Sequence, residues 1–161
     1  MAAEYVPNPL PKLEWGVIPA PVYRLMTVLA AKSSGLANQN DPADWPSADS
    51  PQDFADFFAE QLRLSHSSAQ AAIDFRSLVT AYAHKFHNPR PLLNSLASAQ
   101  QSTPQGLIRR YNSKTVDALR QILSSEPDAG VIAAGFPSLT TDEINELIGT
   151  VSVNSAGLKI D

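Results

Sequence analysis

The chain has 161 residues and a mass of 17.3 kDa, and 43% of its residues are hydrophobic, which suffices for one domain of ordinary size. It contains no cysteine, which excludes disulfides, thiolate metal ligands and a cysteine nucleophile. The net charge of −4 is unevenly distributed, with −5 over residues 1–60, +6 over residues 61–120 and −5 over residues 121–161. Only 17% of the residues are charged, which is below the roughly 25% of a typical soluble domain.

No apolar run approaches the roughly 18–20 residues that cross a bilayer. The N-terminus has neither the basic start nor the apolar stretch of a secretory signal. We therefore expect a soluble protein that is made in the cytoplasm and has no membrane partner.

Residues 1–20 are predicted to form an extended arm, because Pro7, Pro9, Pro11 and Pro19 are incompatible with a regular helix. The arm is too apolar for a solvated tail, so it packs either along its own domain or on a neighbouring subunit. The sequence leaves both arrangements open. Four large apolar residues of the arm and of the later polar loop are candidate subunit contacts: Tyr5, Leu13, Trp15 and Trp45.

Apolar residues at helical spacing predict a first helix over Pro21–Lys32, followed by a polar loop over Ser33–Ser50. Ser50 and Pro51 are typical of a helix start, and they introduce a second helix that carries an aromatic cluster. We expect this cluster, Phe54, Phe57 and Phe58, to lie in the core, with a partner-binding groove as the alternative.

A short Ser-rich connector, Leu64–Ala71, leads into a third helix, which is predicted from about Ser68 to His87. A Pro-rich break, a short helical segment at Leu92–Leu96 and a loop at Ser98–Gln105 precede a fourth helix over Tyr111–Ser124. Thr140 and Glu143 have the spacing of a capping box at the start of a short helix, and Val151 and Val153 indicate a brief strand. The prediction is a mainly α four-helix bundle over residues 21–150, with a C-terminal tail over residues 151–161.

Neither the histidines nor the carboxylates form a recognisable catalytic or metal-binding pattern. His84 and His87 share a helical face, but a zinc site needs three or four ligands with supporting partners. Histidines near a helix C-terminus are explained by the helix dipole. Asp53, Asp56 and Glu60 have no histidine, serine or lysine placed to complete a mechanism. We therefore expect no enzyme activity, no small-molecule substrate, no metal and no cofactor.

The basic middle segment is the most informative feature. Five of its seven basic residues between positions 76 and 120 are arginines, and arginine makes bidentate contacts to phosphate. A basic region between the third and fourth helices therefore indicates binding to a nucleic acid backbone without base reading. The alternative is pairing of this face with the acidic outer thirds, within or between subunits. The candidate nucleic-acid-binding residues are Arg90, Arg109, Arg110, Lys114 and Arg120.

Three segments of the chain stand out: PVYRLMTVLAA at residues 21–31, LVTAYAHKF at residues 78–86 with the following Arg90, and RRYNSKTVDALRQIL at residues 109–123. These segments resemble the coat proteins of rod-shaped plant viruses of the tobacco mosaic type. The resemblance covers about a third of the chain. It implies a four-helix bundle that stacks into a rod around single-stranded RNA, with Arg90, Arg109 and Arg110 facing the phosphates.

The chain also departs from that family. Asn112 and Ser113 stand where the family carries acidic residues, and the Ser-rich connector replaces a strand-forming, aromatic-rich segment.

These observations together predict a self-assembling structural protein, a capsid subunit of a helical virion that contacts RNA phosphates. The low charge fraction fits a subunit whose surface is covered by other copies. Two alternatives remain open. One is a helical adaptor or connector of the phage head–tail type that binds no nucleic acid, and the other is a monomeric binding or immunity protein.

Overall fold

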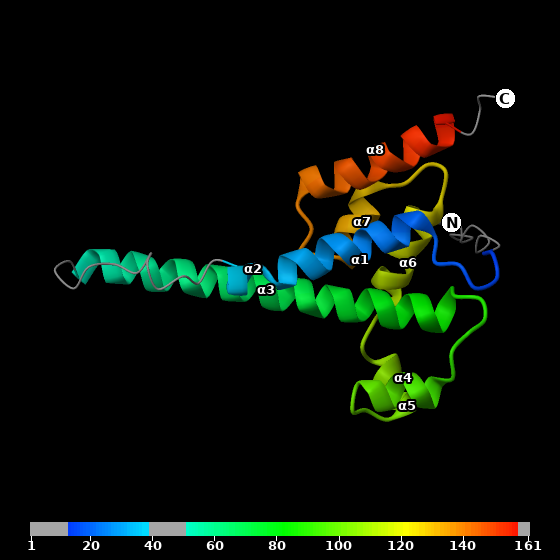
Figure 1. Ribbon diagram of the computed structural model, residues 1–161, viewed down its shortest axis with the longest axis horizontal. Helices are drawn as coiled ribbons and strands as arrows, with labels where there is room; N and C mark the ends of the chain where they lie inside the picture. The colour runs from blue at the N-terminus through cyan, green and yellow to red at the C-terminus, as the bar shows by residue number, and fades with distance from the viewer. Residues whose placement is uncertain (1–12, 39–50, 158–161) are drawn as a thin grey trace, which may run out of the picture.

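The structure is a computed structural model that describes residues 13–38 and 51–157. Within these ranges every regular element is a helix (Figure 1), which confirms the prediction of a mainly α protein. The helices are α1 (Ala20–Ser33), α2 (Gly35–Asn38), α3 (Pro51–Lys85), α4 (Leu93–Ala99), α5 (Pro104–Ile108), α6 (Ser113–Leu123), α7 (Ala129–Gly135) and α8 (Thr141–Gly157).

The long helix α3 corrects the predicted break between a second and a third helix. It is continuous over 35 residues, or about 50 Å, and it includes the Ser-rich connector Leu64–Ala71. Serine is only mildly unfavourable inside a helix, and neither glycine nor proline interrupts this stretch. The Ser68 hydroxyl also donates to the Lys32 carbonyl of α1 at 3.5 Å, so the connector packs as part of the helix.

The core lies where α1 runs beside the C-terminal half of α3 (Figure 1). Helix α6 contacts both of these helices, α7 packs on α6, and α8 contacts α1 and α7. Helices α4 and α5 pack on each other on the opposite side of α3 from α8. The buried cluster consists of Val22, Leu25, Leu29, Leu78, Ala81, Tyr82, Phe86, Ala118, Leu119, Ile122, Ile132, Phe136, Leu139, Ile144 and Leu147.

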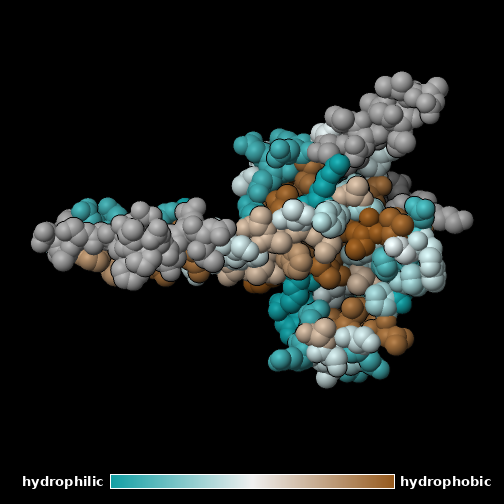
Figure 2. Space-filling model, viewed as in Figure 1, coloured by the Kyte–Doolittle hydropathy of each residue, from teal (hydrophilic) through white to brown (hydrophobic). Residues whose placement is uncertain are grey.

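The N-terminal part of α3 projects beyond α1 and α2 (Figure 1) and carries apolar surface (Figure 2). Phe58 and Leu62 are 58% and 71% exposed there, while Phe54 and Phe57 are half-buried. The expectation that the phenylalanine cluster lies in the core is therefore wrong, because none of its three rings belongs to the buried cluster. The rings pack on each other instead, with centroid distances of 6.1 Å between Phe54 and Phe58 and 5.8 Å between Phe57 and Phe58.

Helix α7 was not predicted, although it has a clear start. The Asp128 carboxylate caps it by accepting from the backbone N–H groups of Gly130 at 2.9 Å and Val131 at 3.2 Å. The capping box that begins α8 is confirmed. The Thr140 N–H donates to Glu143 Oε1 at 2.8 Å, and the Glu143 N–H donates to Thr140 Oγ1 at 3.2 Å.

Helix α8 continues to Gly157, so the brief strand expected at Val151 and Val153 is wrong. The helix that begins at the capping box continues through these β-branched residues without a break. Two valines do not outweigh a helix that has already formed, since the helix propensity of valine is only slightly low.

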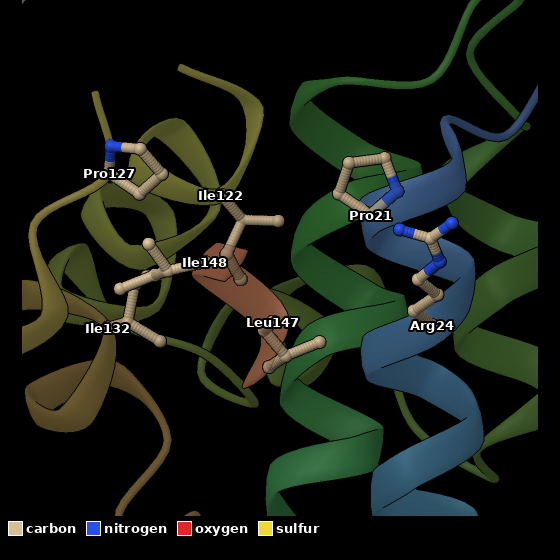
Figure 3. Close-up of a pocket in the computed structure, with 7 residues that line it drawn as sticks. All are labelled: Pro21, Arg24, Ile122, Pro127, Ile132, Leu147 and Ile148. Atoms are coloured by element: carbon tan, nitrogen blue, oxygen red, sulfur yellow. The ribbon is translucent and has the colours of Figure 1, made fainter. Parts of the chain in front are cut away.

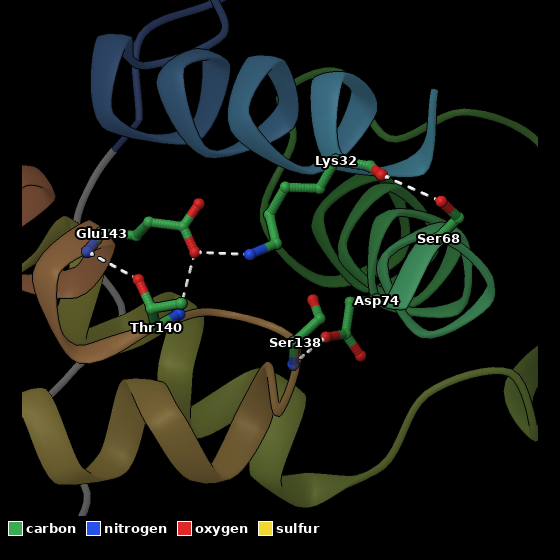
Figure 4. Close-up of polar contacts among 6 residues, drawn as sticks. All are labelled: Lys32, Ser68, Asp74, Ser138, Thr140 and Glu143. Carbon is green, nitrogen blue, oxygen red and sulfur yellow. Dashed lines mark hydrogen bonds and ion pairs between the residues drawn. The ribbon is translucent and has the colours of Figure 1, made fainter. Parts of the chain in front are cut away.

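Polar contacts attach the last two helices to the body (Figure 4). Lys32 Nζ of α1 lies 2.6 Å from Glu143 Oε1 of α8. Burial alone would raise the pKa of Glu143, but hydrogen bonds from Lys32 and Thr140 and the charge of Lys32 outweigh burial and hold that pKa below its usual value. The buried Asp74 carboxylate of α3 accepts from the Ser138 N–H at 2.9 Å, which fixes the turn between α7 and α8.

A basic groove between the end of α3 and α6

Two of the predicted nucleic-acid-binding residues line one groove of about 430 Å³ between the C-terminal end of α3 and the first two turns of α6. Arg90 comes from the loop that follows α3, and Arg120 comes from α6. Lys85, the last residue of α3, joins them. The remaining lining residues are Ser113, Val116 and Asp117.

Local sequence explains both walls of the groove. At the end of α3, the N–H groups of Phe86 and His87 both donate to the Tyr82 carbonyl at 2.9 Å, and the Pro-rich segment that follows cannot continue the helix. On the other wall, the Asn112 side chain caps α6 by accepting from the Thr115 N–H at 3.1 Å. Residues three or four positions apart lie on the same face of a helix, so the lining residues of α6 share one face.

The groove has an excess of positive charge. Lys85, Arg90 and Arg120 face a single carboxylate, Asp117, whose Oδ1 lies 3.9 Å from a terminal nitrogen of Arg120. This ion pair is long, and Arg120 Nε is buried without a hydrogen-bond partner among the described residues. The Arg120 side chain is 26% exposed, and its long ion pair with Asp117 leaves the guanidinium with donor capacity for an anion.

The environment of His84 reports the positive potential of the groove. His84 Nδ1 is hydrogen-bonded to the Tyr111 hydroxyl, which joins α3 to the start of the α6 region. Partial burial, and then the charges of Lys85 and Arg90, lower the pKa of His84 below its usual value. A lowered pKa favours the neutral imidazole, so the positive charge of the groove comes from the lysine and the two arginines.

The other three predicted residues lie outside the groove lining. Arg109 and Arg110 lie in the segment between α5 and α6, where Arg109 is exposed and Arg110 is half-buried. Lys114 lies at the start of α6 and is exposed. The Ser77 hydroxyl donates to the Arg110 carbonyl at 2.9 Å, which holds this segment against α3. Lys85 belongs to the basic segment but is not among the predicted nucleic-acid-binding residues. Its position at the end of a helix, close to Arg90 in sequence, indicates that it can share a site with Arg90.

The residues predicted to contact other subunits differ in their exposure. Leu13 is half-buried against the core of its own chain. Trp15 is 70% exposed. Tyr5 and Trp45 lie outside the described residues.

Two further cavities lie against α1 and α8. An apolar pocket between α1, α6, α7 and α8 has room for about one water molecule (Figure 3), and Arg24 is the only charged residue in its lining. A shallow groove of about 450 Å³ between α1 and α8 contains Tyr23, Arg24, Glu143 and Glu146. Among the described side chains, no three His, Asp or Glu residues gather closely enough to hold a metal ion.

Within the described residues, no helix is both long enough and apolar enough to span a membrane. Comparison of the chain with family models, with curated proteins and with solved structures found no match.

Proposed function

We propose that this protein is a self-assembling structural subunit that binds the phosphate backbone of single-stranded RNA, a role of the kind that coat proteins of helical virions perform. The observation that carries the proposal is the basic groove, in which Lys85, Arg90 and Arg120 converge from separate segments. Convergent cations without a neutralising set of carboxylates are suited to a polyanion.

Three features of the groove favour a phosphate backbone over a small anion. It is an open groove with positive charge contributed along both walls, so that successive phosphates can each meet a cation. Its arginines offer paired donors that match phosphate oxygens. The charges of Lys85 and Arg90 also act outside the lining, on His84, where they add to the effect of burial in lowering its pKa. A backbone ligand also suits a coat subunit, which must bind any genome sequence.

The assembly part of the proposal is supported by the low charge fraction and by the projecting segment of α3. In this proposal α1, α3, α6 and α8 are the principal helices of a bundle, and the exposed apolar residues Phe58 and Leu62 contact other copies. A subunit inside an assembly needs fewer surface charges than a free monomer, since much of its surface is covered.

Salt dependence of RNA binding tests the groove. With a labelled oligo(U) as ligand, Arg90→Ala and Arg120→Ala should each reduce the slope of log affinity against log salt by about 0.7, because each removes one phosphate contact to a single strand. Arg63→Ala is the matched control, since Arg63 is an exposed arginine on the projecting part of α3 and pairs with Glu60. Slopes that are equal in wild type, the groove variants and the control would remove the groove from the proposal.

The protonation of His84 gives an independent measurement. Bound phosphates should offset the charges of Lys85 and Arg90, so the pKa of His84 should rise when oligo(U) binds. An NMR titration of the imidazole resonances measures this change, with the exposed His66 of the same chain as the internal reference. In the free protein, Arg90→Ala should also raise the pKa of His84. A His84 pKa that does not respond to RNA would place the ligand elsewhere.

A second candidate function, an adaptor that binds protein and no nucleic acid, is favoured by the exposure of Phe58 and Leu62 on the projecting segment. Large exposed apolar side chains that cluster on one helix are typical of protein contact surfaces. Sedimentation with and without RNA separates the two candidates. Self-association that RNA leaves unchanged at every salt concentration favours the adaptor.

A further inference from the structure

Residues 15–17 are fixed to the end of α3 although they precede the first helix. The Gly16 N–H donates to the Asn88 carbonyl at 2.6 Å. The Tyr82 hydroxyl lies 3.3 Å from the Val17 carbonyl and 2.8 Å from Nδ1 of His87. Gly16 has a φ of +72°, which residues other than glycine rarely adopt, so the turn beside Trp15 is specified by sequence. The backbone at Trp15 is therefore held next to the loop that carries Arg90.

The side chain of Trp15 is nevertheless 70% exposed. Exposing an indole forgoes much of the free energy that its burial would supply. A flexible tail could carry such a residue without consequence, but here hydrogen bonds of the next two residues, Gly16 and Val17, hold the backbone beside the tryptophan. Asn88, the partner of Gly16, is only two residues from Arg90, which lines the basic groove.

We infer that Trp15 is a stacking platform for an unpaired base of the single-stranded RNA whose phosphates lie in the basic groove. This inference rests on the proposed function and adds the part of the ligand that phosphate contacts do not recognise. Sites for single strands combine a basic groove with exposed aromatic rings, because every base has a face that stacks. A duplex offers no free base face, so Trp15 makes the site selective for single strands.

The position of Trp15 distinguishes it from the other exposed aromatic rings. Phe58 is 58% exposed but lies on the projecting part of α3, and Tyr23 is 63% exposed but lines the separate groove between α1 and α8. Val17 and Ile18, at 44% and 42% exposure, flank the tryptophan with further apolar surface. A second copy of the chain is the competing occupant of this surface, and the charge beside it favours the nucleic acid.

Three probes separate the base from the phosphate: single-stranded oligo(U), an RNA duplex of equal length, and inorganic polyphosphate, which has no bases. Trp15→Ala should weaken oligo(U) binding by about 5- to 100-fold with an unchanged salt slope. It should leave polyphosphate binding unchanged and reduce the preference for oligo(U) over the duplex. Trp15→Phe should keep most of the affinity, and Tyr23→Ala is the control for loss of an exposed ring, since Tyr23 is 63% exposed.

Fluorescence gives a direct readout that does not require the alanine variant to fold. The chain has two tryptophans, so Trp45→Phe leaves Trp15 as the sole indole. Oligo(U) should quench its emission by stacking, whereas polyphosphate should not.

The inference fails if Trp15→Ala binds oligo(U) like wild type while Arg90→Ala still weakens binding, or if the Trp15 emission does not respond to oligo(U). Those results leave the proposed function intact. If wild type binds none of the three probes, the proposed function itself is wrong. If Trp15→Ala changes the sedimentation of the protein but not its oligo(U) affinity, a second copy covers this surface.

Discussion

Replacing Phe136 with alanine is expected to lower the free energy of unfolding by about 3–5 kcal/mol, the range found for removal of a buried aromatic ring. Phe136 has no exposed surface, and it is the largest of the fully buried side chains among the described residues. It ends α7 and belongs to the core cluster shared by α1, α3, α6 and α8. Since single domains have about 5–15 kcal/mol in total, this variant should be marginally folded.

Urea denaturation followed by circular dichroism measures the effect, with Phe58→Ala as the control. Phe58 is 58% exposed, so its removal should change the unfolding free energy by only about 0.5 kcal/mol. Phe136→Leu should retain more stability than Phe136→Ala because it leaves a smaller cavity. Similar stability losses for Phe136→Ala and Phe58→Ala would contradict the assignment of Phe136 to the core.

The second large effect is expected at Gly135, where one added methyl group should destabilise the protein by about 3 kcal/mol, at the upper end of the range for overpacking. A Cβ atom at this position would lie 2.4 Å from the Cβ of Ala118 and 2.6 Å from the carbonyl oxygen of Lys114. The second contact is with backbone, which a change of rotamer cannot relieve. Helices α6 and α7 would have to separate for Gly135→Ala to fold.

Gly149→Ala is the matched control, because nothing lies within 4 Å of a Cβ built at that position of α8. In an open helical position, alanine is better than glycine by about 0.5–1 kcal/mol. The two substitutions are chemically identical and should shift the melting temperature in opposite directions. Stabilisation by both would show that α6 and α7 are not closely packed.

Local signals predicted several elements well. The first helix was predicted over Pro21–Lys32 and is observed as Ala20–Ser33, because helical spacing and flanking loop residues agree there. The capping box of Thr140 and Glu143 was also recognised, since two residues at fixed spacing make all of its hydrogen bonds. Such features depend on a few neighbouring residues and hardly at all on the rest of the chain.

Features that depend on distant packing were missed. The Ser-rich stretch of α3 includes Ser68, which contacts Lys32 of α1, 36 residues earlier in the chain. The small apolar residues of α7 show no amphipathic pattern, and besides the Asp128 cap the helix depends on packing, with Ile132 in the core and Gly135 close against α6. The phenylalanine cluster was assigned to the core because its composition is that of a core, but α1 does not extend far enough along α3 to cover it.

The distribution of charge along the sequence predicts the basic segment, but it does not predict which of its residues share one groove. Arg90 and Arg120 are 30 positions apart, and only the packing of α6 against α3 brings them into one groove with Lys85. The neighbouring Arg109 and Arg110 looked equally suitable in sequence. Neither residue lines the groove, because the Ser77 hydroxyl donates to the Arg110 carbonyl and holds this segment against another part of α3.

The continuity of α3 has a mechanical consequence. Because a single unbroken helix joins the exposed Phe58 to the groove residue Lys85, the two are separated by a fixed length of about 40 Å. Two helices joined by a flexible connector would let that distance vary with each thermal fluctuation. Helix α3 therefore holds any partner of the exposed Phe58 at a set distance from Lys85.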